Sequence, residues 1–263
     1  MLDRVSALAR EASALMRCEF SVEQKGNNSN YVTSADRAVQ EFLAERLPQL
    51  VPGSEVLGEE GDAPVPTSEY IWVIDPIDGT SNFTRGIGLS VISIALTRNR
   101  EPVLAVIYEP TRDELFSAEA GKGAFLNGVP MRVSDRDFAH SHLCSAMSLY
   151  DKRYAPPCFR IIEEVYLQSD DLRRLGSAAL ELAYLAAGRV ELFFEIRLFP
   201  WDAMAGLLLV REAGGFAESL YCSEIPHDRP FPVAAANSRE NFMRLCGIVQ
   251  RHVPTIPYEE RSV

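Results

Sequence analysis

The sequence predicts a mixed α and β protein in which helices are layered on sheets. Near the start, apolar residues recur every three or four positions, which is typical of amphipathic helices. Short apolar runs bounded by turn residues, such as YIWVI at 70–74, are typical of buried strands instead. In the second half, strand-like and helix-like segments alternate along the chain, which favours helices packed over a sheet.

Two helices are predicted in the first 47 residues, over 1–20 and 35–47. Asp36 lies in the first turn of the second helix, where a carboxylate is favourable. The stretch between them, residues 21–34, is polar and rich in turn formers, so we expect a loop there.

The next segment of the chain predicts a sheet. Residues 113–133 are typical of a strand, a loop and a hairpin, and Asn127-Gly128 is the two-residue turn of that hairpin. Gly121-Lys122-Gly123 lacks the spacing of a phosphate-binding loop, so it predicts a bend. Four further strands are predicted at 55–58, 70–75, 89–98 and 102–110.

A polar stretch at 134–142 marks a possible domain boundary, and the elements beyond it alternate. Gly188 is expected to end one of the helices as its left-handed cap. The predicted order is a strand at 142–148, a helix at 154–168, a strand at 171–176, a helix at 177–188, a strand at 189–196 and a helix at 202–214, followed by a strand, a loop and a terminal helix.

Composition narrows the classes of partner. The chain has 47% hydrophobic and 24% charged residues, typical of a globular enzyme, and a net charge of −11. An acidic surface repels phosphate backbones and anionic lipid, so we expect neither nucleic acid nor a membrane as a partner. The sequence has no membrane-spanning apolar run and no signal-peptide pattern, and its five cysteines are widely spaced, which together predict a cytoplasmic protein with free thiols.

Acidic residues stand at the ends of predicted elements. Glu59-Glu60 follows one strand, Asp75 ends another, Asp78 begins a turn, and Asp202 opens a helix. Element ends on one edge of a sheet are where α/β proteins assemble sites from distant sequence. Carboxylates gathered there form a hard oxygen site that suits Mg²⁺ better than zinc.

Each acidic signal also has a simpler explanation. Asp78 can belong to a turn, Asp202 can be a helix N-cap, and Glu59-Glu60 can be a solvated loop. These explanations do not cover Asp75, because it follows a strongly apolar run and is expected to be partly buried. Several partly buried carboxylates without a cation would be unfavourable.

Small residues follow Asp78. The backbone amides of Gly79, Thr80 and Ser81 can approach a ligand closely, and at a helix or turn start they form an anion site. The Thr80 hydroxyl can also orient a water molecule. Cation ligands beside an anion site predict metal-assisted phosphoester hydrolysis.

Four motifs carry a resemblance to a known family. They are VTSAD at 32–36, GEE at 58–60, DPIDGTSNF at 75–83 and WDAMAGLLLVREAGG at 201–215. With these motifs the chain resembles the inositol monophosphatase family of the Mg²⁺-dependent, lithium-sensitive phosphatase superfamily, over roughly residues 25–240.

The resemblance implies an α+β fold, the layered α/β/α/β/α sandwich of the inositol monophosphatase and fructose-1,6-bisphosphatase type. It implies an N-terminal α+β half over 1–135 that carries most metal ligands. A C-terminal α/β half over 136–263 would carry Asp202 and the substrate-side residues, in one compact catalytic unit. The family also implies a homodimer.

Residue roles follow from the same resemblance. Thr80 and Asp36 would activate the attacking water, and Glu59 is counted with them as catalytic. Glu195 would contact substrate hydroxyls. Two or three Mg²⁺ ions would be held by Glu59, Asp75, the Ile77 carbonyl, Asp78 and Asp202, and phosphate by the amides of Gly79, Thr80 and Ser81.

The chain departs from the family pattern at a few positions. Lys25 matches a family lysine only loosely, and Asn30 stands where the family commonly has Asp. Arg197 lies in the segment that lines the alcohol side of the pocket, where it can pair with Glu195, bind a second anionic group of the substrate, or be a surface residue.

The expected activity is hydrolysis of a small phosphorylated metabolite, with inositol monophosphate the leading substrate. Related phosphatases act on 3′-phosphoadenosine 5′-phosphate, fructose 1,6-bisphosphate or histidinol phosphate, and these remain alternatives. A non-catalytic regulator that binds a phosphorylated ligand or partner is the alternative from another class.

Overall fold

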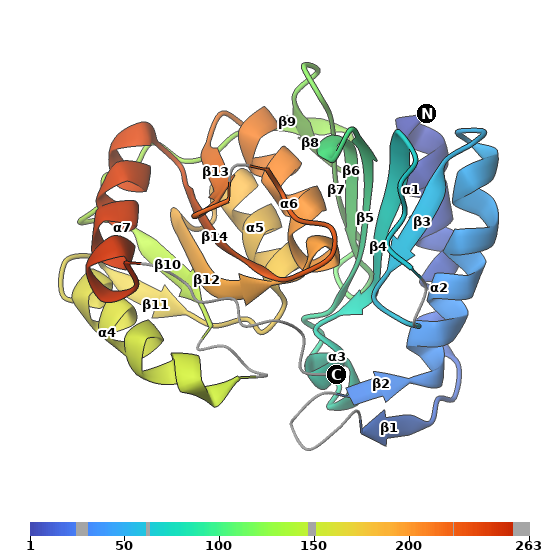
Figure 1. Ribbon diagram of the computed structural model, residues 1–263, viewed down its shortest axis with the longest axis horizontal. Coiled ribbons are helices and arrows are strands. Elements are labelled where there is room, and N and C mark those ends of the chain that lie inside the picture. Colours follow the sequence, from blue (N-terminus) through green and yellow to red (C-terminus); the bar gives the residue numbers. More distant parts are fainter. Residues whose placement is uncertain (25–30, 62–63, 147–150, 223, 255–263) are drawn as a thin grey trace.

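A computed structural model describes residues 1–263 except 25–30, 62–63, 147–150, 223 and 255–263. Its helices and sheets form five layers (Figure 1), so the predicted α/β/α/β/α sandwich is confirmed. Two helices cover the outer face of a seven-stranded sheet, two lie between the sheets, and two cover the outer face of a five-stranded sheet. In that order these pairs are α1 (Leu2–Ala12) with α2 (Ser34–Arg46), α5 (Ala178–Ala186) with α6 (Pro200–Glu212), and α4 (Ala155–Tyr166) with α7 (Arg239–His252).

The seven-stranded sheet follows chain order, and all its neighbours are antiparallel except the first pair, β3 and β4, which is parallel. Asn127 and Gly128 both have positive φ, 49° and 78°, so the predicted hairpin turn is confirmed. The strands are β3 (Glu55–Gly58), β4 (Tyr70–Asp78), β5 (Val91–Arg98), β6 (Glu101–Glu109), β7 (Glu114–Glu119), β8 (Ala124–Leu126) and β9 (Val129–Met131).

The bend at Gly121-Lys122-Gly123 is also confirmed. The amides of Gly121 and Gly123 each donate to the Glu212 carboxylate at 2.8 Å. The Glu212 carboxylate therefore accepts hydrogen bonds from the amides that would bind a ligand in a phosphate-binding loop.

The five-stranded sheet is built from the second half of the chain. Its order is β11-β10-β12-β14-β13, with β10 parallel to both of its neighbours and β14 antiparallel to both of its own. Residues 147 and 148 of the strand predicted at 142–148 lie outside the described residues. The strands are β10 (His142–Ser145), β11 (Asp171–Arg173), β12 (Leu192–Leu198), β13 (Phe216–Ser219) and β14 (Phe231–Ala236).

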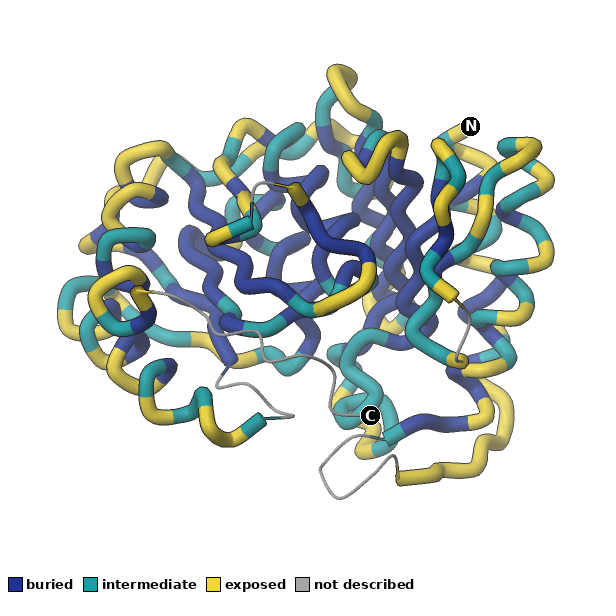
Figure 2. Tube along the Cα trace, in the orientation of Figure 1, coloured by how far each residue is buried: buried dark blue, intermediate teal, exposed yellow. Residues whose placement is uncertain are grey.

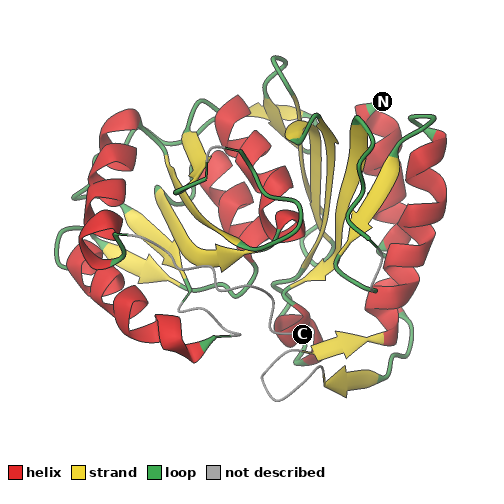
Figure 3. Cartoon of the chain, viewed as in Figure 1, coloured by secondary structure: helices red, strands yellow, loops and turns green. Residues whose placement is uncertain are grey.

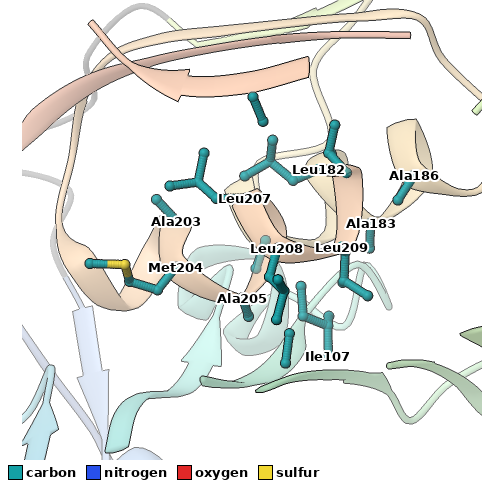
Figure 4. Packing of buried hydrophobic residues seen from close by; sticks show 14 of the residues in the cluster. Ile107, Leu182, Ala183, Ala186, Ala203, Met204, Ala205, Leu207, Leu208 and Leu209 are labelled. Atoms are coloured by element: carbon teal, nitrogen blue, oxygen red, sulfur yellow. The ribbon is translucent and has the colours of Figure 1, made fainter. Parts of the chain in front are cut away.

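The largest apolar core lies between the two sheets, around α5 and α6, where the chain is almost continuously buried (Figure 2). Figure 4 shows buried side chains of α5 and α6, among them Leu182, Leu207 and Leu209, within this layer. A Cβ on Gly206 would lie 2.5 Å from Leu182, so the two helices approach at a position that only glycine fills without displacement. This core holds α6, and with it Asp202, firmly between the sheets.

The structure departs from the predictions in a few places (Figure 3). The stretch 21–34, expected to be a loop, contains the short strands β1 (Val22–Gln24) and β2 (Tyr31–Thr33), which pair antiparallel. Strands of three residues are too short to show an alternating apolar pattern. The helix predicted over 1–20 ends earlier, as α1, and a 3₁₀ turn follows it at Leu15–Arg17.

Gly188 is left-handed, with φ of 71°, just beyond α5 as predicted. The five cysteines are free thiols. Among the described residues, the helices lack the combination of length and apolar character that crossing a bilayer requires.

Candidate metal centre

Asp75 and Asp78 both belong to β4, and a bulge in that strand decides how they face. Residues three apart in a regular strand point to opposite faces. Here Asp75 pairs with Ser93 and Asp78 pairs with Val91. Between these two pairs β4 therefore has one residue more than β5. The extra residue reverses the alternation and brings the two carboxylates together at the strand end.

Asp202 completes a cluster with these two residues. Single carboxylate oxygens of Asp75, Asp78 and Asp202 all lie within 4.8 Å of one another. Asp202 is the third residue of α6, which begins at Pro200, and its Oδ2 accepts the Phe199 N–H at 2.7 Å. The N-cap position that sequence reasoning allowed for Asp202 is therefore wrong, because proline starts the helix two residues earlier.

The second half of the chain also fixes Asp78. Its Oδ2 accepts the Ser177 hydroxyl and the Ala179 N–H, each at 2.7 Å. Asp75 is held more locally, since its Oδ1 accepts the Ile77 N–H at 3.0 Å. The three carboxylates are thus positioned by hydrogen bonds from both sides of the site.

Burial raises the pKa of each carboxyl group, and neighbouring carboxylates raise it further for Asp75 and Asp202. For Asp75, which is 2% exposed, burial is the largest cause, and the charges of Glu59, Asp78 and Asp202 raise the pKa further. The pKa of Asp202 is raised well above its usual value by burial and then by Asp78 and Glu59. Burial raises the pKa of Asp78 to about 6, against the hydrogen bonds of Ser177 and Ala179 that lower it.

Glu59 lies at the same end of the sheet. Its backbone N–H donates to the Ile74 carbonyl at 3.2 Å, which places it beside Asp75. Its half-buried side chain raises the pKa of both Asp75 and Asp202, as expected for a carboxylate close to them. Glu59 therefore lies near the three aspartates, although its carboxylate is not one of those that lie within 4.8 Å of one another.

This donor set fits a divalent cation. Within the described part of the chain, no Arg, Lys or His side chain pairs with Asp75, Asp78 or Asp202. Carboxylates of Asp75 and Asp202 this close repel each other unless a proton or a cation lies between them. Carboxylate oxygens without nitrogen or sulfur ligands suit Mg²⁺.

The Thr80 hydroxyl lies 3.3 Å from Asp36 Oδ1 and 2.9 Å from the Ile77 carbonyl. Asp36 is fully buried in α2, and its other oxygen accepts the N–H and the hydroxyl of Thr33. Burial raises the pKa of Asp36, with Glu60 adding a smaller effect in the same direction. The predicted Thr80–Asp36 pair is therefore in contact, although 44 residues separate its members.

A short helix, α3 (Thr80–Thr84), begins directly after β4 with Gly79 as its left-handed N-cap. The N–H groups of Thr80 and Ser81 have no acceptor within the helix. The Gly79 N–H, in contrast, lowers the pKa of Asp78 through a hydrogen bond. A Cβ on Gly79 would lie 2.8 Å from the Leu89 carbonyl, so this tight approach requires glycine.

Glu195 and Arg197 lie on β12, at the side of the site formed by the second half of the chain. Burial raises the pKa of Glu195 well above its usual value, followed by the charges of Glu181, Asp202 and Asp78. The Arg197 guanidinium lies 5.7 Å from the Phe199 ring centroid and forms no ion pair with a described residue. Lys25 and Asn30 lie outside the described residues.

Sequence reasoning missed several residues that support the site. Ser177 carries only the signal of a helix start, which does not identify Asp78 as its partner. Asn82 donates to the Leu89 and Leu175 carbonyls at 2.7 Å and so ties α3 to the second half of the chain. Gln40 follows Asp36 by four positions, and that spacing could have placed it on the same helix face.

Comparison with known proteins agrees with this geometry. The model of the inositol monophosphatase family matches residues 2–253. The chain is 44% identical over 194 residues to Nus factor SuhB of Salmonella typhimurium, covering 73% of this chain and 72% of that protein. It is 38% identical over 216 residues to the inositol-1-monophosphatase of Mesorhizobium japonicum, covering 81% and 80%.

A solved IMPase structure from Thermotoga maritima superposes with a TM-score of 0.82 at 31% identity, covering 96% of this chain and 98% of that one. Fold, acidic cluster and sequence similarity agree, and the chain belongs to the inositol monophosphatase family.

Proposed function

We propose that this protein hydrolyses a small phosphate monoester with Mg²⁺, with inositol monophosphate as the leading substrate. The observation that carries the proposal is the cluster of Asp75, Asp78 and Asp202 beside the Thr80–Asp36 pair. Cation ligands, a water-orienting hydroxyl and the first amides of α3 meet at one end of β4, which suits the transfer of a phosphoryl group to water.

Two or three Mg²⁺ ions would be held by carboxylates of both halves of the chain. Bound there, Mg²⁺ supplies Lewis-acid stabilisation of phosphoryl and leaving-group oxygens and lowers the pKa of water. Their proposed ligands are Glu59, Asp75, the Ile77 carbonyl, Asp78 and Asp202.

Thr80 and Asp36 would orient and activate the attacking water, with Glu59 beside them. The Thr80 hydroxyl has one hydrogen for two acceptors, and donation to Asp36 leaves the Ile77 carbonyl available to a cation. The lone pairs of Thr80 can then accept from water, and the raised pKa of Asp36, caused by its burial, makes it a better proton acceptor.

The phosphate group would lie against the turn of Gly79, Thr80 and Ser81, with the amides of Thr80 and Ser81 donating to it while the Gly79 amide bonds Asp78. On the alcohol side, Glu195 would accept hydrogen bonds from substrate hydroxyls, and Arg197 would attract a second anionic group where the substrate has one. Substrates with such a group, including 3′-phosphoadenosine 5′-phosphate and fructose 1,6-bisphosphate, as well as histidinol phosphate, are the alternatives within the same chemistry.

We further propose that residues 1–135 and 136–263 are two halves of one catalytic unit, because Asp202 and Ser177 from the second half meet Asp78 from the first. A cytoplasmic homodimer remains the expectation for this family member. Light scattering of the purified protein tests the dimer.

A second candidate is a non-catalytic regulator that binds a phosphorylated ligand or a partner. Relatives as similar as 44% carry the name Nus factor SuhB, which is not a phosphatase name. The acidic composition predicted that nucleic acid is not a partner, and relatives with this name do not support that prediction.

Phosphate release from a panel of monoesters and bisphosphates, ranked by kcat/KM with Mg²⁺, tests the proposal. We expect Asp75→Asn to abolish turnover, because it removes a carboxylate from the centre of the cluster. Asp135→Asn, at an exposed position, is the matched control and should retain full activity. No Mg²⁺-dependent release from any substrate would favour the regulator, and full turnover in Asp75→Asn would contradict the metal-binding role.

A further inference from the structure

Gln40 on α2 contacts the loop that carries Glu59. Its Nε2–H donates to the Glu60 carbonyl, and its Oε1 accepts the Glu60 N–H at 2.9 Å. One side chain therefore bonds both backbone groups of a single residue. A carboxamide can do this because it is donor and acceptor at once, whereas a carboxylate is an acceptor only.

Gly58 makes room for this interaction. A Cβ at Gly58 would lie 2.3 Å from Gln40 Oε1 and 2.5 Å from its Cδ. The backbone of Gly58 does not have positive φ, so the requirement for glycine here comes from the Gln40 side chain and not from backbone strain. Gly58 and Gln40 thus form an interlocking pair.

The loop is fixed from two directions. On the strand side, Gly58 pairs with Ile74 of β4, and the Glu59 N–H donates to the Ile74 carbonyl at 3.2 Å. On the helix side, Gln40 fixes Glu60. Glu59 stands between the two attachments, so both ends of its short backbone segment are oriented.

We propose that Gln40 is a positioning residue that directs the Glu59 carboxylate toward Asp75 and so sets the Mg²⁺ affinity of the site. The inference rests on the proposed Mg²⁺-dependent function. It follows from the two hydrogen bonds to Glu60, from the space left by Gly58, and from the Glu59 N–H bond to the carbonyl of Ile74, the residue before Asp75. Residues that orient metal ligands typically change metal affinity 10–100-fold when they are removed.

The same helix serves a second group of the site. Asp36 and Gln40 are four residues apart on α2, so they lie on one face about 6 Å apart along the axis. Asp36 contacts Thr80, and Gln40 contacts the Glu59 loop. In Figure 1, α2 runs beside β3 and β4, the two strands that lead to these groups. One rigid helix therefore sets the relative position of the water-orienting pair and the Glu59 ligand.

Gln40→Ala and Gln40→Met test the inference, the second retaining side-chain volume without the hydrogen bonds. Gln49→Ala is the control, because the Gln49 side chain also donates to a backbone carbonyl but on the protein surface. Mg²⁺ binding is measured by calorimetry on the substrate-free protein, and phosphate release is measured across Mg²⁺ concentrations.

We expect both Gln40 variants to bind Mg²⁺ about 10-fold or more weakly, with kcat at saturating Mg²⁺ and the substrate KM within about twofold of the parent. Gln49→Ala should match the parent. Unchanged Mg²⁺ affinity in Gln40→Met, in a parent that binds Mg²⁺ and releases phosphate, would overturn this inference alone. A parent that neither binds Mg²⁺ nor releases phosphate would overturn the proposed function as well.

Gly58→Ala supplies an independent check by a double-mutant cycle. In the parent it should weaken Mg²⁺ binding about as much as Gln40→Ala, because the added methyl group displaces the amide. In the Gln40→Ala background the same change should have less than a twofold effect. Additive losses would show that Gly58 acts without Gln40 and would contradict the interlocking pair.

Discussion

Replacement of Asp78 by Asn should stabilise the magnesium-free protein near neutral pH. The folded-state pKa of Asp78 is about 6, against an ordinary value of 3.8, chiefly because the group is buried. A raised carboxyl pKa means that the native state binds the proton more tightly than the unfolded state. Its ionisation therefore destabilises the native state as pH rises through 6, and the effect is absent below pH 4.

The magnitude follows from the size of the shift. About two pKa units correspond to about 3 kcal/mol. Asparagine still accepts from Ser177 and Ala179 but loses the strength of charged hydrogen bonds, about 1 kcal/mol. The net gain of about 2 kcal/mol predicts a Tm about 4 °C above the parent at pH 7.5.

Differential scanning calorimetry in chelator, at pH 4.5 and 7.5, measures this effect. The gain should shrink toward zero at the lower pH, where the parent carboxyl group is largely protonated. Excess Mg²⁺ should reverse the order of the two Tm values. At a Mg²⁺ concentration 100 times its Kd the parent gains about 2.7 kcal/mol of stability, and the variant gains less. A magnesium-free variant that melts below the parent at pH 7.5, or equal Mg²⁺ responses in both, would refute the reasoning.

Three further changes have expected outcomes. Arg197→Ala should lower kcat/KM at least about 10-fold for bisphosphates but less than threefold for monoesters, and equal losses in the substrate panel would exclude a role in selecting a second anion. Gly206→Ala should lower Tm by several degrees, since a Cβ there would lie 2.5 Å from Leu182 and overpacking costs about 1–3 kcal/mol. Asn82→Ala should lower the free energy of unfolding by about 2 kcal/mol, measured in urea, because the Leu175 carbonyl loses its amide donor; an unchanged midpoint would contradict this.

Local patterns were enough to predict most of the fold. The apolar run before Asp75 predicted β4, and the Asn127-Gly128 pair predicted the hairpin of β8 and β9. Both signals lie within a few residues of the structure they specify. The short strands at 22–24 and 31–33 were missed, since each is too brief to carry a periodic pattern.

The site was less accessible to such reasoning. Its acidic residues were recognised from their places at element ends, but the bulge that turns Asp75 and Asp78 to one side depends on the register with β5. The hydrogen bond from Ser177 to Asp78 joins residues 99 positions apart. Tertiary packing determines such hydrogen-bond partners, and the residues adjacent to Ser177 or Asp78 in the sequence do not indicate them.

The position of α6 between the two sheets has a consequence for biosynthesis. During translation the strand with Asp75 and Asp78 leaves the ribosome well before Asp202 is made. A nascent chain that ends before this helix therefore lacks Asp202 of the acidic cluster and the buried layer that covers the first sheet. Prematurely terminated products should therefore expose the apolar face of that sheet and be sensitive to proteases.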